Sequence, residues 1–303
     1  MKNNIRTKEL KEGEIIPLNF DFVFTSIFTN PDNMIIIENF VSCLLDLDLK
    51  LVKGNIKILN RNLSVENKKE RNKQVDLLLE YRGEKINIEI NNYYSKGITD
   101  RNIVYASYIH GKQLDYEDNT YSNINKTIQI NLNNIRTNST LRERYFFRND
   151  KNTILSEKFE IDQIDMVLAR DICYNDYSNK LARWCMVLTS KTKEEFKKYL
   201  GEDLMEKEAK EKLEEKTSKM SDDEEVYALY SAYTKEELEK NTLIEEAEQR
   251  GVEKGFEKGT KEGIEQGIKN EKISIAKNMI KENIDIDIIS KITDLTKEEI
   301  EKL

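Results

Sequence analysis

The sequence predicts a mixed α/β fold followed by a helical C-terminal extension, and three observations support this prediction. Residues 74–91 hold two runs of alternating apolar and polar residues around a short turn, as is typical of a β-hairpin. Helical and strand patterns then alternate along the first 190 residues. Beyond residue 190, charged helical patterns continue to the end of the chain.

The hairpin register follows from a turn centred on Arg82-Gly83. One face is then wholly apolar and pairs Leu79 with Ile86, Leu77 with Ile88, and Val75 with Ile90. The other face pairs Glu80 with Lys85, Leu78 with Asn87, Asp76 with Glu89, and Gln74 with Asn91. Tight primed turns prefer Asn-Gly or Asp-Gly over Arg-Gly, so an odd loop with a bulge, which shifts the register by one residue, stays open.

Asp76 and Glu89 are two carboxylates set opposite each other in this register. Directly opposed side chains lie about 4.5–5.5 Å apart at Cβ, and like charges at that separation destabilise a sheet. A divalent cation between them would remove the repulsion, which is a nuclease-like arrangement. The alternative is that this face of an antiparallel hairpin is simply solvated.

Periodicity and start signals place the other elements of the core. We expect helices at residues 21–28, 34–45 and 99–114, strands within 55–80 around a polar loop, and further strands at 126–132 and within 155–170. Helices that hold Trp184 and the charged run 191–219 should follow. The predicted domains are residues 1–190, a charged helical region at 191–250, and a small C-terminal unit at 251–303.

The C-terminal region carries glycines at a spacing of four residues, namely Gly251, Gly255, Gly259, Gly263 and Gly267. Each glycine inside a helix costs about 0.8–1 kcal/mol relative to alanine, and close approach to another helix would offset that cost. The stripe therefore predicts a homo-oligomer formed through the C-terminal helices. The alternative is a loosely helical, low-complexity linker.

The end of the chain predicts a compact helical unit that resembles a degraded helix-turn-helix. Isoleucines form two apolar faces, and Thr296-Lys297-Glu298-Glu299 is a capping-box signature for a final helix. Residues 271–303 carry six lysines against eight acidic residues. This balance favours a packing role for the unit over DNA binding.

Charge and composition limit the classes of function. The net charge of −8 argues mildly against nucleic acid, but residues 1–134 carry 18 basic and 18 acidic residues, so the acidic excess lies entirely in the remainder. A basic loop in the first half (Lys68, Lys69, Arg71 and Lys73) could still meet phosphate. Because His110 is the only histidine, hydrolysis here has to come from carboxylates and a hard cation.

The same survey predicts a cytoplasmic protein with no membrane partner. No window holds 18 apolar residues, and the N-terminus lacks the apolar stretch of a signal peptide. The three cysteines, Cys43, Cys173 and Cys185, are widely spaced in apolar settings and are expected to be reduced, buried thiols.

Four stretches of the chain together resemble the PD-(D/E)xK nuclease superfamily and, more narrowly, the recombination-promoting nuclease family of transposase-like proteins. They are DFVFTSIF, VDLLLEYRGEKINIEIN, RNIVYASYIHGKQLDYEDNTYSNINKTIQINLN and the glycine-repeat tail that ends in KEEIEKL. The resemblance implies a restriction-endonuclease-like core with a helical C-terminal extension. It also implies DNA as a partner, with roles in recombination, mobile elements or defence.

The resemblance further implies a metal site. Asp76, Glu89 and the Ile90 carbonyl would bind Mg²⁺, for which Mn²⁺ could substitute. Asn91 stands where the family has Gln and the superfamily Lys, and would position water or a phosphate oxygen. Asp21 matches an acid on the first helix, although Asp is also a routine N-cap.

A motif on the helix after the hairpin matches Arg101, Tyr105 and Gln113, which the resemblance places in contact with phosphate or substrate. Arg101 would serve equally well as a surface salt-bridge partner, and Tyr105 as core packing. The resulting hypothesis is a Mg²⁺-dependent DNA endonuclease. The alternative is a catalytically inactive nuclease-like fold that acts as an interaction or regulatory module.

Overall fold

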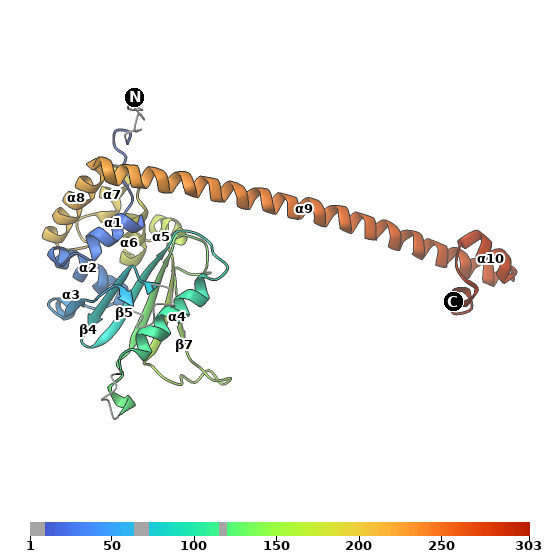
Figure 1. Ribbon diagram of the computed structural model, residues 1–303, viewed down its shortest axis with the longest axis horizontal. Coiled ribbons are helices and arrows are strands. Elements are labelled where there is room, and N and C mark those ends of the chain that lie inside the picture. Colours follow the sequence, from blue (N-terminus) through green and yellow to red (C-terminus); the bar gives the residue numbers. More distant parts are fainter. Residues whose placement is uncertain (1–9, 64–72, 115–119) are drawn as a thin grey trace. The chain divides into compact units, whose positions relative to one another are not determined.

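The computed structural model describes residues 10–63, 73–114 and 120–303 (Figure 1). These form two compact units, Met1–Ser231 and Ala232–Leu303, and helix α9 (Glu224–Lys281) runs from one into the other. The first unit is a mixed α/β domain, which confirms the predicted fold class. The expected divisions after residues 190 and 250 stay predictions, and the second of them falls inside α9.

The first unit contains the strands and most of the helices. Its strands are β1 (Ile56–Ile58), β2 (Asn62–Leu63), β3 (Lys73–Gln74), β4 (Leu77–Tyr81), β5 (Glu84–Asn91), β6 (Thr127–Asn133), β7 (Arg142–Phe146) and β8 (Phe159–Asp165). Its helices are α1 (Asp21–Phe28), α2 (Met34–Leu45), α3 (Leu49–Val52), α4 (Ile98–Gly111), α5 (Ala169–Asn175), α6 (Lys180–Thr189), α7 (Lys193–Leu200) and α8 (Lys207–Asp222). Short 3₁₀ turns are η1 (Pro31–Asn33), η2 (Tyr121–Asn123) and η3 (Met166–Leu168).

The main sheet has six strands in the order β1-β4-β5-β6-β8-β7. Strands β5, β6 and β8 run parallel, while the outer pairs are antiparallel. A parallel neighbour requires a crossover connection, and α4 supplies it between β5 and β6. Helix α4 lies over one face of the sheet, and α1, α2 and α6 gather on the other side (Figure 1).

The β4–β5 hairpin has the predicted register. Leu79 pairs with Ile86, Leu77 with Ile88, and Leu78 with Asn87. Two residues form the turn, and both have positive φ, 50° at Arg82 and 88° at Gly83. A type I′ turn requires this backbone, so the hairpin keeps the tight turn although its first residue is Arg.

The predicted pairing ends at the open end of the hairpin. The chain bends at Asp76, and β4 begins one residue later. Gln74, expected opposite Asn91, instead pairs with Asn62 in a separate two-stranded sheet. The bend also turns Val75 to the other face, where it packs with Leu78 and Ile109 of α4 instead of beside Leu77. These two expectations were therefore wrong, because a regular alternation does not continue through a bend.

The two faces of the sheet have different characters. Isoleucine and leucine side chains of β5 and β6 fill the core on one face, at most 6% exposed. Four aromatic side chains gather in the helical layer: Phe40 lies 4.9 Å from both Phe28 and Trp184, and Phe24 lies 4.6 Å from Phe28. On the other face the side chains Asn87, Glu89 and Asn91 are 0–3% exposed. The solvated-face alternative for the hairpin is therefore not what the structure shows.

Besides the 3₁₀ turns, helix α3 and strand β7 were absent from the predicted set. Helix α3 is a single turn whose Asp48 N-cap accepts a hydrogen bond from the Lys50 N–H. Strand β7 contains two arginines and is an edge strand, which pairs with β8 alone among the strands that the structure describes. Both are short and carry weak periodicity, which explains why the sequence patterns did not reveal them.

The second unit is helical. It contains the C-terminal part of α9, α10 (Ile286–Thr293) and α11 (Lys297–Ile300), which enclose a small core of Ala276, Ile289, Leu295 and Ile300. Thr296 and Glu299 form the predicted capping box at the start of α11. In the part of the chain that the structure describes, no helix is both long and apolar enough to cross a membrane.

Candidate active site

Asp76 and Glu89 meet at the bend that begins the hairpin. The Asp76 N–H donates to Glu89 Oε1 over 3.3 Å, and the Ile90 N–H donates to Asp76 Oδ2 over 2.8 Å. Asn87 Nδ2 also donates to Glu89 Oε1, over 3.2 Å. Backbone and amide donors therefore fix both carboxylates: Asp76 through the N–H of Ile90, the neighbour of Glu89, and Glu89 through the N–H of Asp76 and the side chain of Asn87.

Burial dominates the electrostatics of this pair. Desolvation raises the pKa of Asp76 above its ordinary value, against the opposing effects of the Ile90 N–H, Arg61 and Arg101. Desolvation and then the negative charge of Asp76 raise the pKa of Glu89 to about 8. Glu89 is buried and Asp76 partly buried, and the ionised form of each disfavours that of the other, so Glu89 retains a proton near neutral pH when no cation is bound.

The donor set fits a hard divalent cation. Asp76 and Glu89 supply carboxylate oxygens, the ligands that Mg²⁺ prefers, and a cation would replace the proton that the pair otherwise retains. Among the residues that the structure describes, no three His, Cys, Asp or Glu side chains are grouped to hold a metal ion. Any ion here would therefore complete its shell with water, backbone carbonyl or substrate oxygens.

Asp21 stands at the start of α1, and Asn92 ties that helix to the end of β5. Asn92 Nδ2 donates to the Asn19 carbonyl over 2.7 Å and approaches Asp21 Oδ1 at 3.4 Å. Asn19 Nδ2 donates back to Asn92 Oδ1 over 2.8 Å. The N-cap of α1 is Phe20, which makes no side-chain capping bond, so Asp21 is the first residue of the helix and not its N-cap.

The electrostatics also connect Asp21 to the pair. Desolvation and the charge of Asp76 raise the pKa of Asp21 to about 6. Part of the Asp21 residue reaches solvent, which leaves it accessible from the outside. It lies within electrostatic reach of Asp76 without forming a compact three-carboxylate cluster.

Arg101 and Asn91 border the carboxylates on the side of α4. Arg101 Nη2 donates to Asn91 Oδ1 over 2.8 Å and lies 4.0 Å from Glu89 Oε2. The Arg101 guanidinium also sits 6.0 Å from the ring centre of Tyr105, which packs against the core under α4. Tyr105 thus supports Arg101 from one turn further along the helix.

Gln113 does not join this group. Its side chain bonds Thr127 Oγ1 over 2.9 Å and both the carbonyl and the N–H of Asn125, each over 3.1 Å. These partners lie where β6 begins, whereas Asn91 lies where the parallel strand β5 ends. Gln113 therefore anchors the loop before β6, apart from the Asp76–Glu89 pair, and its expected phosphate contact stays a prediction. His110 bonds Thr127 at the same end of the sheet.

Sequence reasoning missed Arg61 and Asn92. Arg61 Nε donates to the Val75 carbonyl over 2.8 Å, and its charge lowers the pKa values of both Asp76 and Asp21. Nothing in the local pattern around Arg61 distinguishes it, whereas Asn92 directly follows Asn91 and could have been noticed. Lys68, Lys69 and Arg71 of the expected basic loop lie outside the residues that the structure describes.

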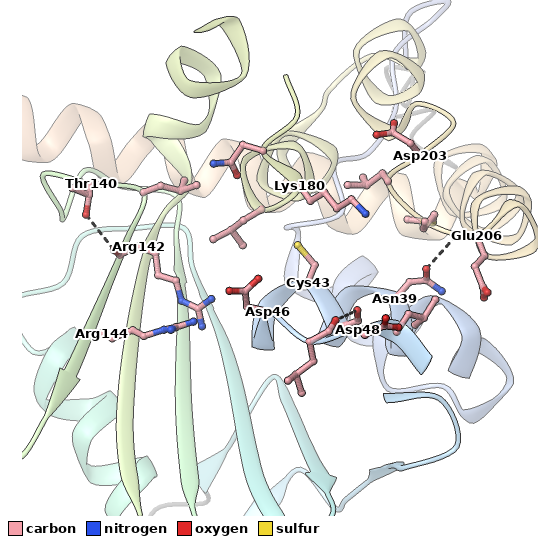
Figure 2. A pocket seen from close by; sticks show the side chains of 18 residues that line it. Asn39, Cys43, Asp46, Asp48, Thr140, Arg142, Arg144, Lys180, Asp203 and Glu206 are labelled. Atoms are coloured by element: carbon pink, nitrogen blue, oxygen red, sulfur yellow. Dashed lines mark hydrogen bonds between the residues drawn. The ribbon is translucent and has the colours of Figure 1, made fainter. Parts of the chain in front are cut away.

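A separate cavity of about 1300 Å³ opens on the opposite face of the sheet. Figure 2 shows Arg142 and Arg144 of β7 pointing toward Asp46, the residue that follows α2. Arg142 Nε donates to the fully buried Asp162 over 2.9 Å, so this charge is already paired. None of the predicted site residues lines this cavity.

The comparisons with known proteins agree with this geometry. Residues 18–247 match the PD-(D/E)XK nuclease family transposase, and residues 269–303 match the C-terminal HTH domain of the Rpn/YhgA-like nuclease family. No curated protein and no solved structure matches the chain. The first match spans the sheet, the Asp76–Glu89 pair and α4, and covers well over half of the chain. The chain therefore belongs to the PD-(D/E)XK nuclease family of transposases.

Proposed function

We propose that this protein is a Mg²⁺-dependent DNA endonuclease that hydrolyses phosphodiester bonds, with Mn²⁺ as a competent substitute. The observation that carries the proposal is the contact between the buried Glu89 and the partly buried Asp76. Burial raises the pKa values of both acids, which means that ionising them in the folded protein costs free energy. A bound divalent cation would offset that cost. A structural pair without a ligand has no such reason to keep two acids together away from water.

In this proposal each residue around the pair has a stated task. Asp76, Glu89 and the Ile90 carbonyl hold the ion, and Asp21 contributes from α1 through a bound water. When bound, the ion supplies Lewis acidity to the scissile phosphate and lowers the pKa of an attacking water. Arg101, whose side chain is 46% exposed, contacts the phosphate oxygens.

One observation favours the rival function of an inactive interaction module. Asn91 stands where the superfamily has a cationic Lys, and its side chain is engaged by Asn133 and Arg101. If nothing else supplies that positive charge, the site would bind a metal without cutting DNA.

A plasmid-nicking assay on the full chain separates the two functions. Wild type is compared with Asp76→Asn and Glu89→Gln in Mg²⁺, with Glu84→Gln as a matched control. Glu84 lies at the far end of β5, at the hairpin turn. We expect cleavage by wild type and the control, and its loss in the two site variants. Equal cleavage by all four proteins would refute the site, and no cleavage by any would support the inactive module.

The C-terminal region extends the proposal to DNA engagement and self-association. The HTH match supports DNA contact by residues 269–303, although lysines are outnumbered by acids there. Along α9, Val252, Phe256 and Ile264 are 59–76% exposed beside the regularly spaced glycines. An apolar stripe this exposed on a charged helix favours docking against a second copy of the chain.

A further inference from the structure

Three amide side chains and one guanidinium form a hydrogen-bonded row across the polar face of the sheet. Arg101 Nη2 donates to Asn91 Oδ1, and Asn91 Nδ2 donates to Asn133 Oδ1, each over 2.8 Å. Asn133 Nδ2 then donates to Gln163 Oε1 over 2.8 Å and approaches Thr137 Oγ1 at 3.3 Å. Since β5, β6 and β8 are adjacent, the row connects the site to the third strand of the parallel group.

The direction of the row is dictated by Arg101. A guanidinium has donors only, so the Asn91 atom that it contacts must be the amide oxygen. The Asn91 amide nitrogen therefore points away from the site, and Asn133 must meet it with an oxygen. Asn91 and Asn133 are 3% and 2% exposed, so a flipped amide would leave buried groups without partners.

This direction limits the role of Asn91, which stands where the superfamily has a lysine. A phosphate oxygen accepts hydrogen bonds, so a residue that contacts it must donate. The Asn91 amide nitrogen is turned toward Asn133, and its oxygen is turned toward Arg101. Asn91 therefore cannot take the place of a cationic lysine, but it can hold a cation that does.

We propose that Asn133 is a positioning residue that holds the Asn91 amide oxygen toward Arg101, so that Arg101 supplies the positive charge at the scissile phosphate. This inference rests on the proposed nuclease function and names how the site compensates for the missing lysine. The Asn91 oxygen on one side and Glu89 Oε2, 4.0 Å away, on the other restrain the guanidinium. Its half-exposed side chain leaves donors for a bidentate phosphate contact.

Asn131 provides a matched control within the same strand. It shares the face of Asn133, is fully buried, and accepts a hydrogen bond from Gln129 Nε2 over 2.8 Å. It stands two residues before Asn133 and bonds neither Asn91 nor Arg101 in any contact that the structure describes. A general requirement for buried amides in β6 would make both residues equally important.

The test is a double-mutant cycle on the full chain, with kcat of plasmid cleavage and binding of a short duplex in Ca²⁺ as two readouts. We expect Asn133→Leu to lower kcat by about 10- to 100-fold, the usual effect of losing a residue that orients a site ligand. Asn133→Asp keeps an acceptor for Asn91 and should recover most of that loss. In an Arg101→Ala background, Asn133→Leu should cost nothing further in either readout.

Several outcomes would overturn the proposal while leaving the nuclease function intact. One is that the losses of kcat from Asn133→Leu and Arg101→Ala add up in the double variant. Another is that Asn131→Leu lowers kcat as much as Asn133→Leu does. The third is that Asn133→Leu cleaves DNA as wild type does. Thermal unfolding of each variant shows whether it is folded. If Asn133→Leu does not fold, the same measurements are made on Asn133→Asp. Wild-type cleavage that does not depend on Asp76 would instead refute the Asp76–Glu89 site, and absence of any cleavage would refute the nuclease function; either result would remove the basis of this proposal.

Discussion

The backbone N–H of Asp76 donates to Oε1 of Glu89 over 3.3 Å, although the β4–β5 ladder begins only at Leu77. The two acids therefore meet just outside the regular hairpin, where a bend sets the position of Asp76. The facing strand returns a second hydrogen bond from Ile90 to Asp76. Hydrogen bonds to side chains therefore position Asp76, and the β4–β5 ladder does not.

The metal-free protein should lose stability as pH rises from about 5 to 8. The folded state raises the pKa values of Asp21, Asp76 and Glu89, to about 6 for Asp21 and about 8 for Glu89, so it binds more protons than the unfolded chain in this range. The free energy of unfolding then falls with rising pH. The measurement is the midpoint of thermal unfolding in EDTA at several pH values.

Glu89→Gln is the control for this pH dependence, because it removes the acid with the most strongly raised pKa and keeps the shape of the side chain. The Glu89→Gln variant should lose less stability than wild type between pH 5 and pH 8. At pH 8 in EDTA it should unfold at a higher temperature than wild type. A parallel decline in both proteins would show that other groups cause it.

Mg²⁺ should stabilise the wild type more at pH 8 than at pH 6. Binding requires deprotonated carboxylates, and the raised pKa values keep protons on the pair at the lower pH. At 100 times the dissociation constant, one bound ion adds about 2.7 kcal/mol. Thermal unfolding with and without Mg²⁺ measures the effect, which Asp76→Asn should abolish. An equal shift in that variant would place the bound ion elsewhere.

The hairpin turn gives a prediction of the opposite kind, a stabilising substitution. Arg82 has a φ of 50°, a backbone that Asn tolerates better than Arg does. Arg82→Asn should raise the free energy of unfolding by up to about 1 kcal/mol. Gly83→Ala should lower it, since its φ is 88° and a Cβ would lie 3.1 Å from Asn125 Nδ2. Urea unfolding measures both, and an unstable Arg82→Asn would contradict the assigned turn.

This hairpin shows how far sequence reasoning reaches. Alternation fixed the register from Leu77 to Ile88, because one face of the pair had to be buried. It failed at Val75 and Gln74, since a bend carries no signature in the alternation. The spacing of Glu89 and Asn91 placed both on one face, but only the folded chain brings Asn133 of β6 against Asn91.

The same contrast holds for the helix after the hairpin. Arg101 and Gln113 belong to one motif of the resemblance, yet Arg101 reaches Asn91 where β5 ends, whereas Gln113 lies past the end of α4 and bonds Thr127 where β6 begins. Arg61 reaches the site from before the hairpin, through a contact with the Val75 carbonyl that no local pattern encodes. Contacts between distant segments are set by packing, so residue type and spacing do not determine them.

Phe40 should be among the most costly core residues to truncate. It is fully buried, and its ring lies 4.9 Å from those of both Phe28 and Trp184. Phe40→Ala should lower the free energy of unfolding by about 3–5 kcal/mol, through lost burial and a residual cavity. Trp184, the only tryptophan, reports urea unfolding by fluorescence. Phe22→Ala is the control, since Phe22 is 42% exposed on α1, and a comparable loss there would contradict the assigned core.

The glycine stripe of α9 yields two effects of opposite sign in one variant. A Cβ at Gly259 or Gly263 would meet nothing within 4 Å, so Gly→Ala at both should stabilise the isolated helix by about 0.8–1 kcal/mol each. If a second copy packs against the stripe, the same methyl groups block its close approach and weaken association.

Sedimentation velocity of the full chain over a concentration series measures the association. Lys261→Ala, about 200° around the helix from either glycine, is the control and should associate as wild type does. Unchanged or tighter association of the double variant would show that the stripe does not form the interface.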